Sequence, residues 1–113
     1  MTEVFFYETT NSKSDQVLYK LLLKAVVNKS ILVKTKDEMS MIKLDEFLWA
    51  NEPASFLPHS KSEDSNSNLS PIVITSKFVN PNNASILFLV DTEIDDFDYL
   101  KKFDRICVIF KKN

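Results

Sequence analysis

The segment Ile86-Leu87-Phe88-Leu89-Val90 decides the fold class, because all five of its residues are apolar. A strand that is apolar on both sides is typical of a parallel sheet whose two faces are covered by other elements. Comparable short apolar segments recur along the chain and read as further strands. The strands predicted in this way are 4–7, 30–34, 71–75, 86–90 and 106–110.

The apolar residues between these strands recur with helical spacing. One group, which follows the polar residues 9–14, predicts an amphipathic helix: Leu18, Leu21, Leu22 and Ala25. A second group predicts another helix with one apolar side: Met41, Leu44, Phe47 and Leu48. Thr35 and Glu38 have the spacing of a capping box, so we expect the Thr35 hydroxyl to cap this second helix.

A third, shorter helix is expected from about residue 95 to residue 102, with Phe97 and Leu100 directed inward. Strands therefore alternate with helices. This order predicts a single α/β domain, residues 1–113, with three layers and a mainly parallel sheet flanked by helices. The polar segment 60–70 is expected to be a mobile loop within that domain.

The composition excludes several classes of protein. The chain has no glycine, which both the Walker A loop and the dinucleotide fingerprint require next to phosphate, and left-handed positions must therefore fall to Asn and Asp. The net charge of −2 creates no overall attraction to nucleic acid or to a membrane, and the single Cys107 allows no internal disulfide. With neither a membrane-length apolar run nor a secretory signal pattern, the cytoplasm is the expected compartment.

Residues that could carry chemistry are few. His59 is the only histidine, and Cys107 lies in a predicted buried strand, where a thiol is usually inert. The acids between Asp91 and Asp98 begin like a calcium loop. Its sixth and twelfth positions are Asp96 and Lys102, however, where glycine and glutamate are required. No cofactor or metal is expected, and the acids are interpreted as stabilising a helix N-terminus. The alternative is a small metal-dependent or hydrolytic enzyme that uses His59 with the Asp91–Asp98 acids.

The segment from Lys43 to His59, K-L-D-E-F-L-W-A-N-E-P-A-S-F-L-P-H, contains the strongest candidates for binding a protein. Trp49 and Phe56 are seven residues apart and flank a turn. At roughly 100° per residue, Trp49 lies roughly 130° from the centre of the apolar side of its helix, and so outside the main core face. Two interpretations stay open: Trp49 covers the helix end or the next loop, or Trp49 and Phe56 form an exposed anchor pair for a partner.

Two parts of this segment, Leu44-Asp45-Glu46-x-Leu48-Trp49-Ala50 and Ser55-Phe56-x-Pro58-His59, resemble the chi subunit family of bacterial DNA polymerase III holoenzyme. The similarity extends more loosely over nearly the whole chain. It implies a nucleotide-binding-like fold without a nucleotide and a non-catalytic adaptor. Chi proteins bind the psi subunit, which links them to the clamp loader. By the resemblance, Trp49 and Phe56 serve this psi-side surface, which a helicase partner can also use, and Pro58 and His59 match its motif.

Chi proteins also bind the acidic C-terminal tail of single-stranded-DNA-binding protein. In longer family members a helix after the last strand supplies basic residues for this tail, whereas this chain ends at Asn113. The basic residues that remain for such a site are Lys101, Lys102, Arg105, Lys111 and Lys112. The terminal lysines also raise the hypothesis of direct single-strand binding. They are scattered, however, whereas a DNA-tracking groove needs more cations interleaved with aromatic rings, so no direct nucleic-acid contact is expected.

Overall fold

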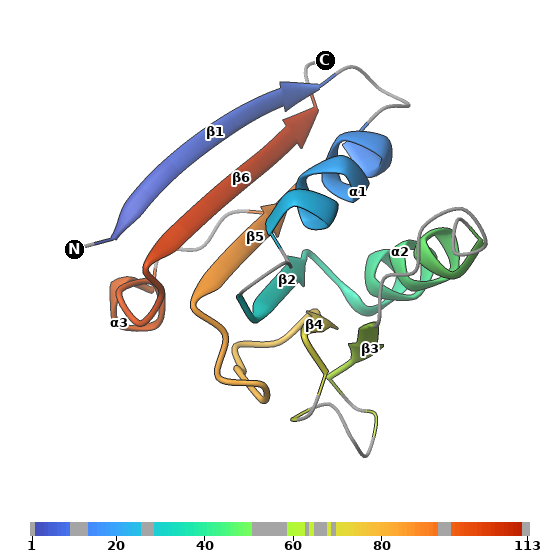
Figure 1. Ribbon diagram of the computed structural model, residues 1–113. Coiled ribbons are helices and arrows are strands. Elements are labelled where there is room, and N and C mark those ends of the chain that lie inside the picture. The colour runs from blue at the N-terminus through green and yellow to red at the C-terminus, as the bar shows by residue number, and fades with distance from the viewer. Residues whose placement is uncertain are drawn as a thin grey trace.

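The computed structural model describes residues 2–9, 14–25, 29–50, 59–62, 64, 68, 70–92 and 96–111. Their helices and strands follow in the order β1 (Glu3–Thr9), α1 (Ser14–Ala25), β2 (Ile31–Thr35), α2 (Glu38–Ala50), β3 (His59–Lys61), β4 (Ile72–Thr75), β5 (Ile86–Val90), α3 (Phe97–Leu100) and β6 (Arg105–Lys111). The strands form one sheet in the order β1-β6-β5-β2-β4-β3, and every neighbouring pair is parallel (Figure 1). The predicted α/β class and parallel sheet are confirmed.

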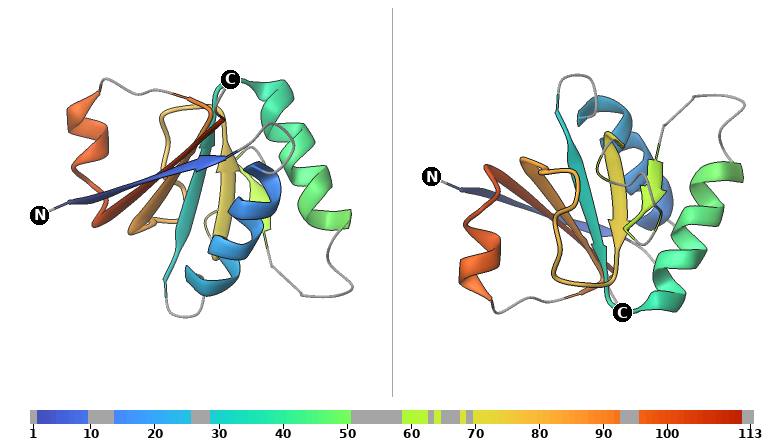
Figure 2. Two further views of the ribbon diagram at one scale, coloured as in Figure 1. Left: turned by 90° about the horizontal axis from the view of Figure 1, so that it is seen from above. Right: turned by 90° about the horizontal axis from the view of Figure 1, so that it is seen from below.

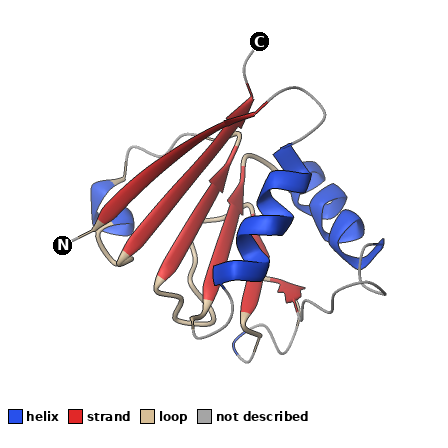
Figure 3. Ribbon diagram, turned by 45° about the horizontal axis from the view of Figure 1, so that its top comes forward, coloured by secondary structure: helices blue, strands red, loops and turns tan. Residues whose placement is uncertain are grey.

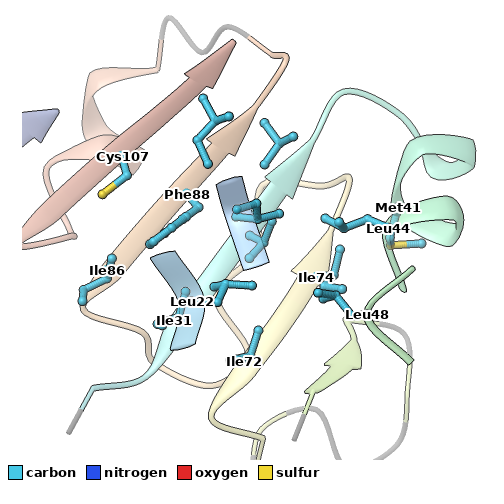
Figure 4. Packing of buried hydrophobic residues seen from close by; sticks show 14 residues of the cluster. Leu22, Ile31, Met41, Leu44, Leu48, Ile72, Ile74, Ile86, Phe88 and Cys107 are labelled. Atoms are coloured by element: carbon cyan, nitrogen blue, oxygen red, sulfur yellow. The ribbon is translucent and has the colours of Figure 1, made fainter. Parts of the chain in front are cut away.

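Helices lie on both faces of the sheet, which makes three layers. α1 and α2 cover one face and α3 covers part of the other (Figures 2 and 3). Under α1 and α2, alternate residues of the strands form the larger hydrophobic core with residues of both helices (Figure 4). Its fully buried members are Leu18, Leu22, Ile31, Val33, Leu48, Ile72, Ile74, Phe88 and Ile109. Among the described helices, none is both long and apolar enough to cross a bilayer.

The second face of the sheet has a smaller core, built around Tyr99 of α3 and Phe103. The two rings meet edge to face at a centroid distance of 5.3 Å, and the Tyr99 hydroxyl donates to the carbonyl of Val79 at 2.8 Å. Burial raises the pKa of Tyr99 to about 12, because the charged phenolate would lose its hydration. Lys34 is also buried here, and its Nζ donates to the carbonyl of Thr35 at 2.7 Å. Burial lowers the pKa of Lys34 for the same reason.

The predicted cap of α2 is corrected. Asp37, and not Thr35, caps the helix: its Oδ1 accepts from the backbone N–H of Ser40 at 2.8 Å. The hydrogen bonds from Ser40 lower the pKa of Asp37 because they stabilise its carboxylate. Thr35 instead ends β2 as a buried residue, and its hydroxyl donates to the carbonyl of Asp37 at 3.1 Å. The β-branched Thr35 thus extends the strand, and the helix starts after Asp37.

The third helix is shorter than predicted, and its orientation is corrected. α3 begins after Asp96, whose Oδ1 accepts from the backbone N–H of Tyr99 at 3.1 Å. With this start Tyr99 faces the sheet and Leu100 packs beside it, whereas Phe97 is 79% exposed. The expectation for Leu100 was therefore right and that for Phe97 was wrong. In a helix of only four residues one side chain sets which side faces the sheet, and here it is Tyr99.

Two further expectations concern turns and loops. Asn83 and Asp91 have positive φ angles of 49° and 52°, as expected for a chain that has no glycine to place at such positions. The polar segment predicted to be a loop from residue 60 begins instead in a strand, since Ser60 and Lys61 belong to β3. A polar composition did not prevent this strand because its pairing with β4 uses backbone groups.

Candidate protein-binding site at the α2–β3 edge

β3 forms one edge of the sheet and pairs with β4 alone, with His59 opposite Ile72 and Lys61 opposite Ile74. It is only three residues long. Side chains reinforce its short ladder: the Ser60 and Ser70 hydroxyls lie 2.7 Å apart. The backbone N–H of Ser62 also donates to the carbonyl of Ile74 at 2.9 Å. Polar side chains therefore fix a strand that is too short to be stable through backbone pairing alone.

α2 packs on the sheet beside this edge. Its apolar side is as predicted, because Met41, Leu44 and Leu48 are buried and Phe47 is partly buried. Figure 4 shows the first three reaching toward Ile74 of β4. Burying a Leu side chain contributes about 1.5–3 kcal/mol, so this contact fixes the position of α2. The helix carries the first part of the Lys43–His59 segment, and β3 begins with its last residue.

His59 faces α2 and not the solvent. Its side chain is 0% exposed, and its Nε2 lies 3.5 Å from Oδ1 of Asp45, a side chain that is itself only 14% exposed. Asp45 belongs to the first half of the segment that carried the family resemblance, and His59 closes the second half. The contact therefore joins the two halves across the intervening residues. The ring of His59 therefore packs the start of β3 against α2.

The aromatic residues predicted to bind a partner are only partly within the described structure. Trp49 lies in the last turn of α2, but its side chain lies outside the described residues, as do all of Phe56 and Pro58. The structure does fix the two ends of the segment that contains them. α2 ends at Ala50 and β3 starts at His59, and the two elements are neighbours at the same edge of the sheet (Figure 1).

Comparison with known proteins identifies the family. Residues 1–113, the whole chain, match the family described as "DNA polymerase III chi subunit, HolC". The chain belongs to this family. It is also 31% identical to a protein of Rickettsia prowazekii (strain Madrid E) named "Probable DNA polymerase III subunit chi". The alignment of the two proteins is 116 positions long, and it covers 96% of this chain and 70% of the relative. Chi-family membership makes the chain a DNA polymerase III subunit with a role in DNA replication.

The chi-family chain does not bring together the groups of the alternative enzyme hypothesis. Asp91 follows β5, three strands away from β3, which is about 14 Å across the sheet at the usual strand spacing. Asp96 and Asp98 flank or belong to α3, which lies on the opposite face of the sheet from α2 (Figure 2). The ring of His59 faces α2. Glu93 and Asp95 lie outside the described residues. Within the described part of the chain, no three His, Cys, Asp or Glu side chains are close enough to hold a metal.

The thiol of Cys107 lies among the buried residues of the larger core, as expected. Burial raises its pKa, an effect that the nearby charge of Arg105 partly opposes. A raised pKa keeps the sulfur in its protonated, weakly nucleophilic form. In the chi-family chain this cysteine is therefore a core residue.

Among the described residues, the basic side chains expected to serve an acidic tail do not gather into one site. Lys101 and Lys102 follow α3, and Lys101 pairs with Asp98 at 3.1 Å. Arg105 begins β6 and Lys111 ends it, which separates their Cα atoms by about 20 Å along the strand. Lys112 lies outside the described residues. Arg105 is therefore separated from Lys111 by the length of a strand.

A cavity that the sequence did not indicate lies beside Arg105. It has a volume of about 310 Å³ and is lined by Glu3, Lys24, Ala25, Lys29, Ser85, Ile86, Asp104 and Arg105. Three basic residues there outnumber two acids, so its lining carries one net positive charge. Sequence reasoning missed these lysines because Lys24 lies in the last turn of the first helix and Lys29 follows it, some 80 residues before Arg105, and no motif links them. The cavity forms because β1, β6 and β5 are neighbours in the sheet and the end of α1 lies beside them.

Proposed function

We propose that this chain is a non-catalytic adaptor of the bacterial replicative DNA polymerase and binds a psi-like subunit of the clamp loader. Its membership of the chi family supports a role within the DNA polymerase III complex. The observation that carries the proposed surface is the 3.5 Å contact between His59 and Asp45. Because it joins the middle of α2 to the start of β3, it supports one continuous surface at this edge.

In this proposal, Trp49 and Phe56 are the residues that contact the partner. Large aromatic residues contribute most to binding at protein interfaces because they remove much apolar area from water with few rotatable bonds. Pro58 and His59 instead set the position of the segment that carries Phe56. A helicase that uses the same surface would compete with the psi-like subunit, so the two could not occupy one chi chain together.

The test is the Trp49→Ala variant, titrated by calorimetry with the cognate psi-like subunit. We expect binding to weaken by about 2 kcal/mol or more, which is about a 30-fold rise in Kd. The matched control is Phe97→Ala, because Phe97 is an exposed aromatic residue of α3 on the other face of the sheet. The control should bind like the wild type, and circular dichroism should show both variants folded.

Two outcomes would contradict this assignment. Unchanged binding by Trp49→Ala would mean that the partner docks elsewhere on the chain. Loss of the fold in that variant would mean that Trp49 is a packing residue and that the first of the two interpretations of its role is right. In either case a Phe56→Ala titration shows whether the far side of the turn still belongs to an interface.

A second role, binding of the acidic tail of single-stranded-DNA-binding protein, is supported by the cavity beside Arg105. The pairing of Arg105 with Glu3 is loose at 3.9 Å, and Lys24 and Lys29 are exposed, so their charges are accessible to an anionic peptide. We expect Lys24→Ala/Lys29→Ala to weaken binding of the tail peptide about tenfold, and added salt to weaken wild-type binding. Lys101→Ala/Lys102→Ala is the matched control. A tenfold loss in the control alone would move the site to the end of α3.

A further inference from the structure

The edge of the sheet opposite to β3 is formed by β1, a regular strand of seven residues that pairs with β6 along its whole length. Within the described residues no strand pairs with its other side. Proteins usually protect such an edge with charged side chains, a proline, a bulge or a very short strand. β1 has charged residues only near its ends, Glu3 and Glu8, and its register with β6 is unbroken from Glu3 to Thr9.

Several exposed apolar residues lie together at this edge. Nine large apolar residues among the described ones are exposed, and four of them belong to β1 or its neighbour β6: Val4, Phe5, Phe6 and Phe110. Phe6 is 70% exposed, which is unusual for a phenylalanine in the middle of a strand. The side chains of Val4 and Phe6 lie on the α3 face, since they pair in register with Ile106 and Val108.

The backbone of β1 also has hydrogen-bonding groups directed away from the sheet. The N–H of Glu3 donates to the carbonyl of Asp104, so the odd-numbered residues of β1 are bonded toward β6. In a parallel pair the alternate residues point their N–H and C=O groups the other way. Those of Val4 and Phe6 therefore point to the open edge, where another strand can accept and donate four hydrogen bonds.

We propose that this edge binds the β1 edge of a second copy of the same chain, antiparallel, with the two-fold axis at Phe5. In this register Val4 of each copy forms a doubly hydrogen-bonded pair with Phe6 of the other. The two Phe5 rings lie opposite one another on the α1 face. The three exposed apolar residues of each strand then cover those of its partner, and two six-stranded sheets become one.

Charge favours a second copy in this register. The two acids of β1, Glu3 and Glu8, fall opposite Tyr7 and Thr2 of the other chain, so no like charges face each other. The buried area is expected to be small. One strand pair covers less than the roughly 1,600 Å² of a standard interface, so the dimer is weak, with Kd on the order of 10–100 µM. β3 remains outside this interface at the far edge of the sheet, and the proposal is independent of the function assigned to that edge.

The first test is sedimentation velocity on the full chain from about 1 to 500 µM. The wild type should change from monomer to dimer over this range, whereas Phe6→Lys should remain monomeric or show at least a tenfold higher Kd. Phe97→Lys is the matched control, because it adds the same charge to a more exposed phenylalanine outside the edge, and it should dimerise like the wild type. A wild type that stays monomeric throughout overturns the proposal, and the edge would then be open to a strand of another protein.

A second measurement fixes the register and does not depend on the fold of Phe6→Lys. With Cys107 replaced by Ala, a Phe5→Cys variant should form an intermolecular disulfide under mild oxidation. The two Cα atoms of such a non-hydrogen-bonded pair lie about 4.5 Å apart, which a disulfide can span. A Phe6→Cys variant is the control and should cross-link at least tenfold more slowly. Equal rates for the two variants, or faster cross-linking of Phe6→Cys, would contradict the register.

Discussion

The two edges of the sheet are built in opposite ways. β3 has three polar residues, lies beside α2 and is connected to it through His59 and Asp45. β1 has seven residues, most of them exposed and four of them apolar or aromatic in sequence, and no described element covers its outer side. A short polar strand resists pairing with other chains, whereas a long apolar one favours it.

The comparison also separates two kinds of interaction surface. At the β3 edge the strand is only three residues long and offers little backbone for pairing, so a partner would recognise the side chains of the segment between α2 and β3. At the β1 edge the backbone itself offers hydrogen bonds. The first kind of surface can be selective for one partner, and the second pairs with any compatible strand unless register and charge restrict it.

The largest expected contrast between the edges is in stability. Leu48→Ala, which removes a fully buried side chain of α2, should lower the free energy of unfolding by about 2–5 kcal/mol. Phe6→Ala should change it by about 0.5 kcal/mol or less, because most of that ring is already in contact with water. Urea denaturation at low protein concentration measures both. A loss in Phe6→Ala as large as that in Leu48→Ala would show that the β1 edge is covered within the monomer.

A smaller effect is expected from the contact that holds β3. Asp45→Ala should lower the free energy of unfolding by about 1–3 kcal/mol, because the buried ring of His59 loses its carboxylate. Hydrogen exchange at the backbone amides of β3 should also become faster. Asp98→Ala is the matched control: its carboxylate is 88% exposed, so we expect a change of about 0.5 kcal/mol or less. Equal losses in the two variants would show that the contact does not stabilise this edge.

The smallest effect concerns the thiol next to β1. Cys107 lies in register with Phe5, and burial raises its pKa above the ordinary 9.0. Less thiolate is therefore present in the folded than in the unfolded chain, so a thiol reagent should label the folded chain at least tenfold more slowly at about pH 8. The difference should shrink as the pH rises through the raised pKa. Labelling at the rate of the urea-unfolded chain would mean that the β1–β6 pair opens freely.

Local patterns predicted much of the fold. The continuous apolar segments became the buried strands β2, β4 and β5, and the helical spacing of Met41, Leu44 and Leu48 identified the buried side of α2. Such patterns work because burial of a strand or of one helix face depends on residues a few positions apart. They failed where two neighbouring signals competed, as at Thr35 and Asp37 for the cap of α2, and where backbone pairing formed β3 from polar residues.

The candidate site divides in the same way. The sequence identified Trp49, Phe56 and His59 as one group, because they lie within a short segment whose residues resemble a known motif. It could not assign them separate roles, and the structure directs the ring of His59 toward Asp45. The basic cavity was not predicted at all, since Lys24, Lys29 and Arg105 are adjacent only because α1 and the first residues of β6 meet at one end of the sheet.

The sequence by itself determined an α/β chain without glycine phosphate loops, with the residues that form each buried face and a motif of the chi family. These properties are local, so each follows from the spacing of neighbouring residues. Only the tertiary structure decided that β1 and β3 form the two edges and that Asp45 meets His59. Strand order depends on contacts between distant segments, whose energies are balanced over the whole sheet and cannot be inferred from any one stretch of the chain.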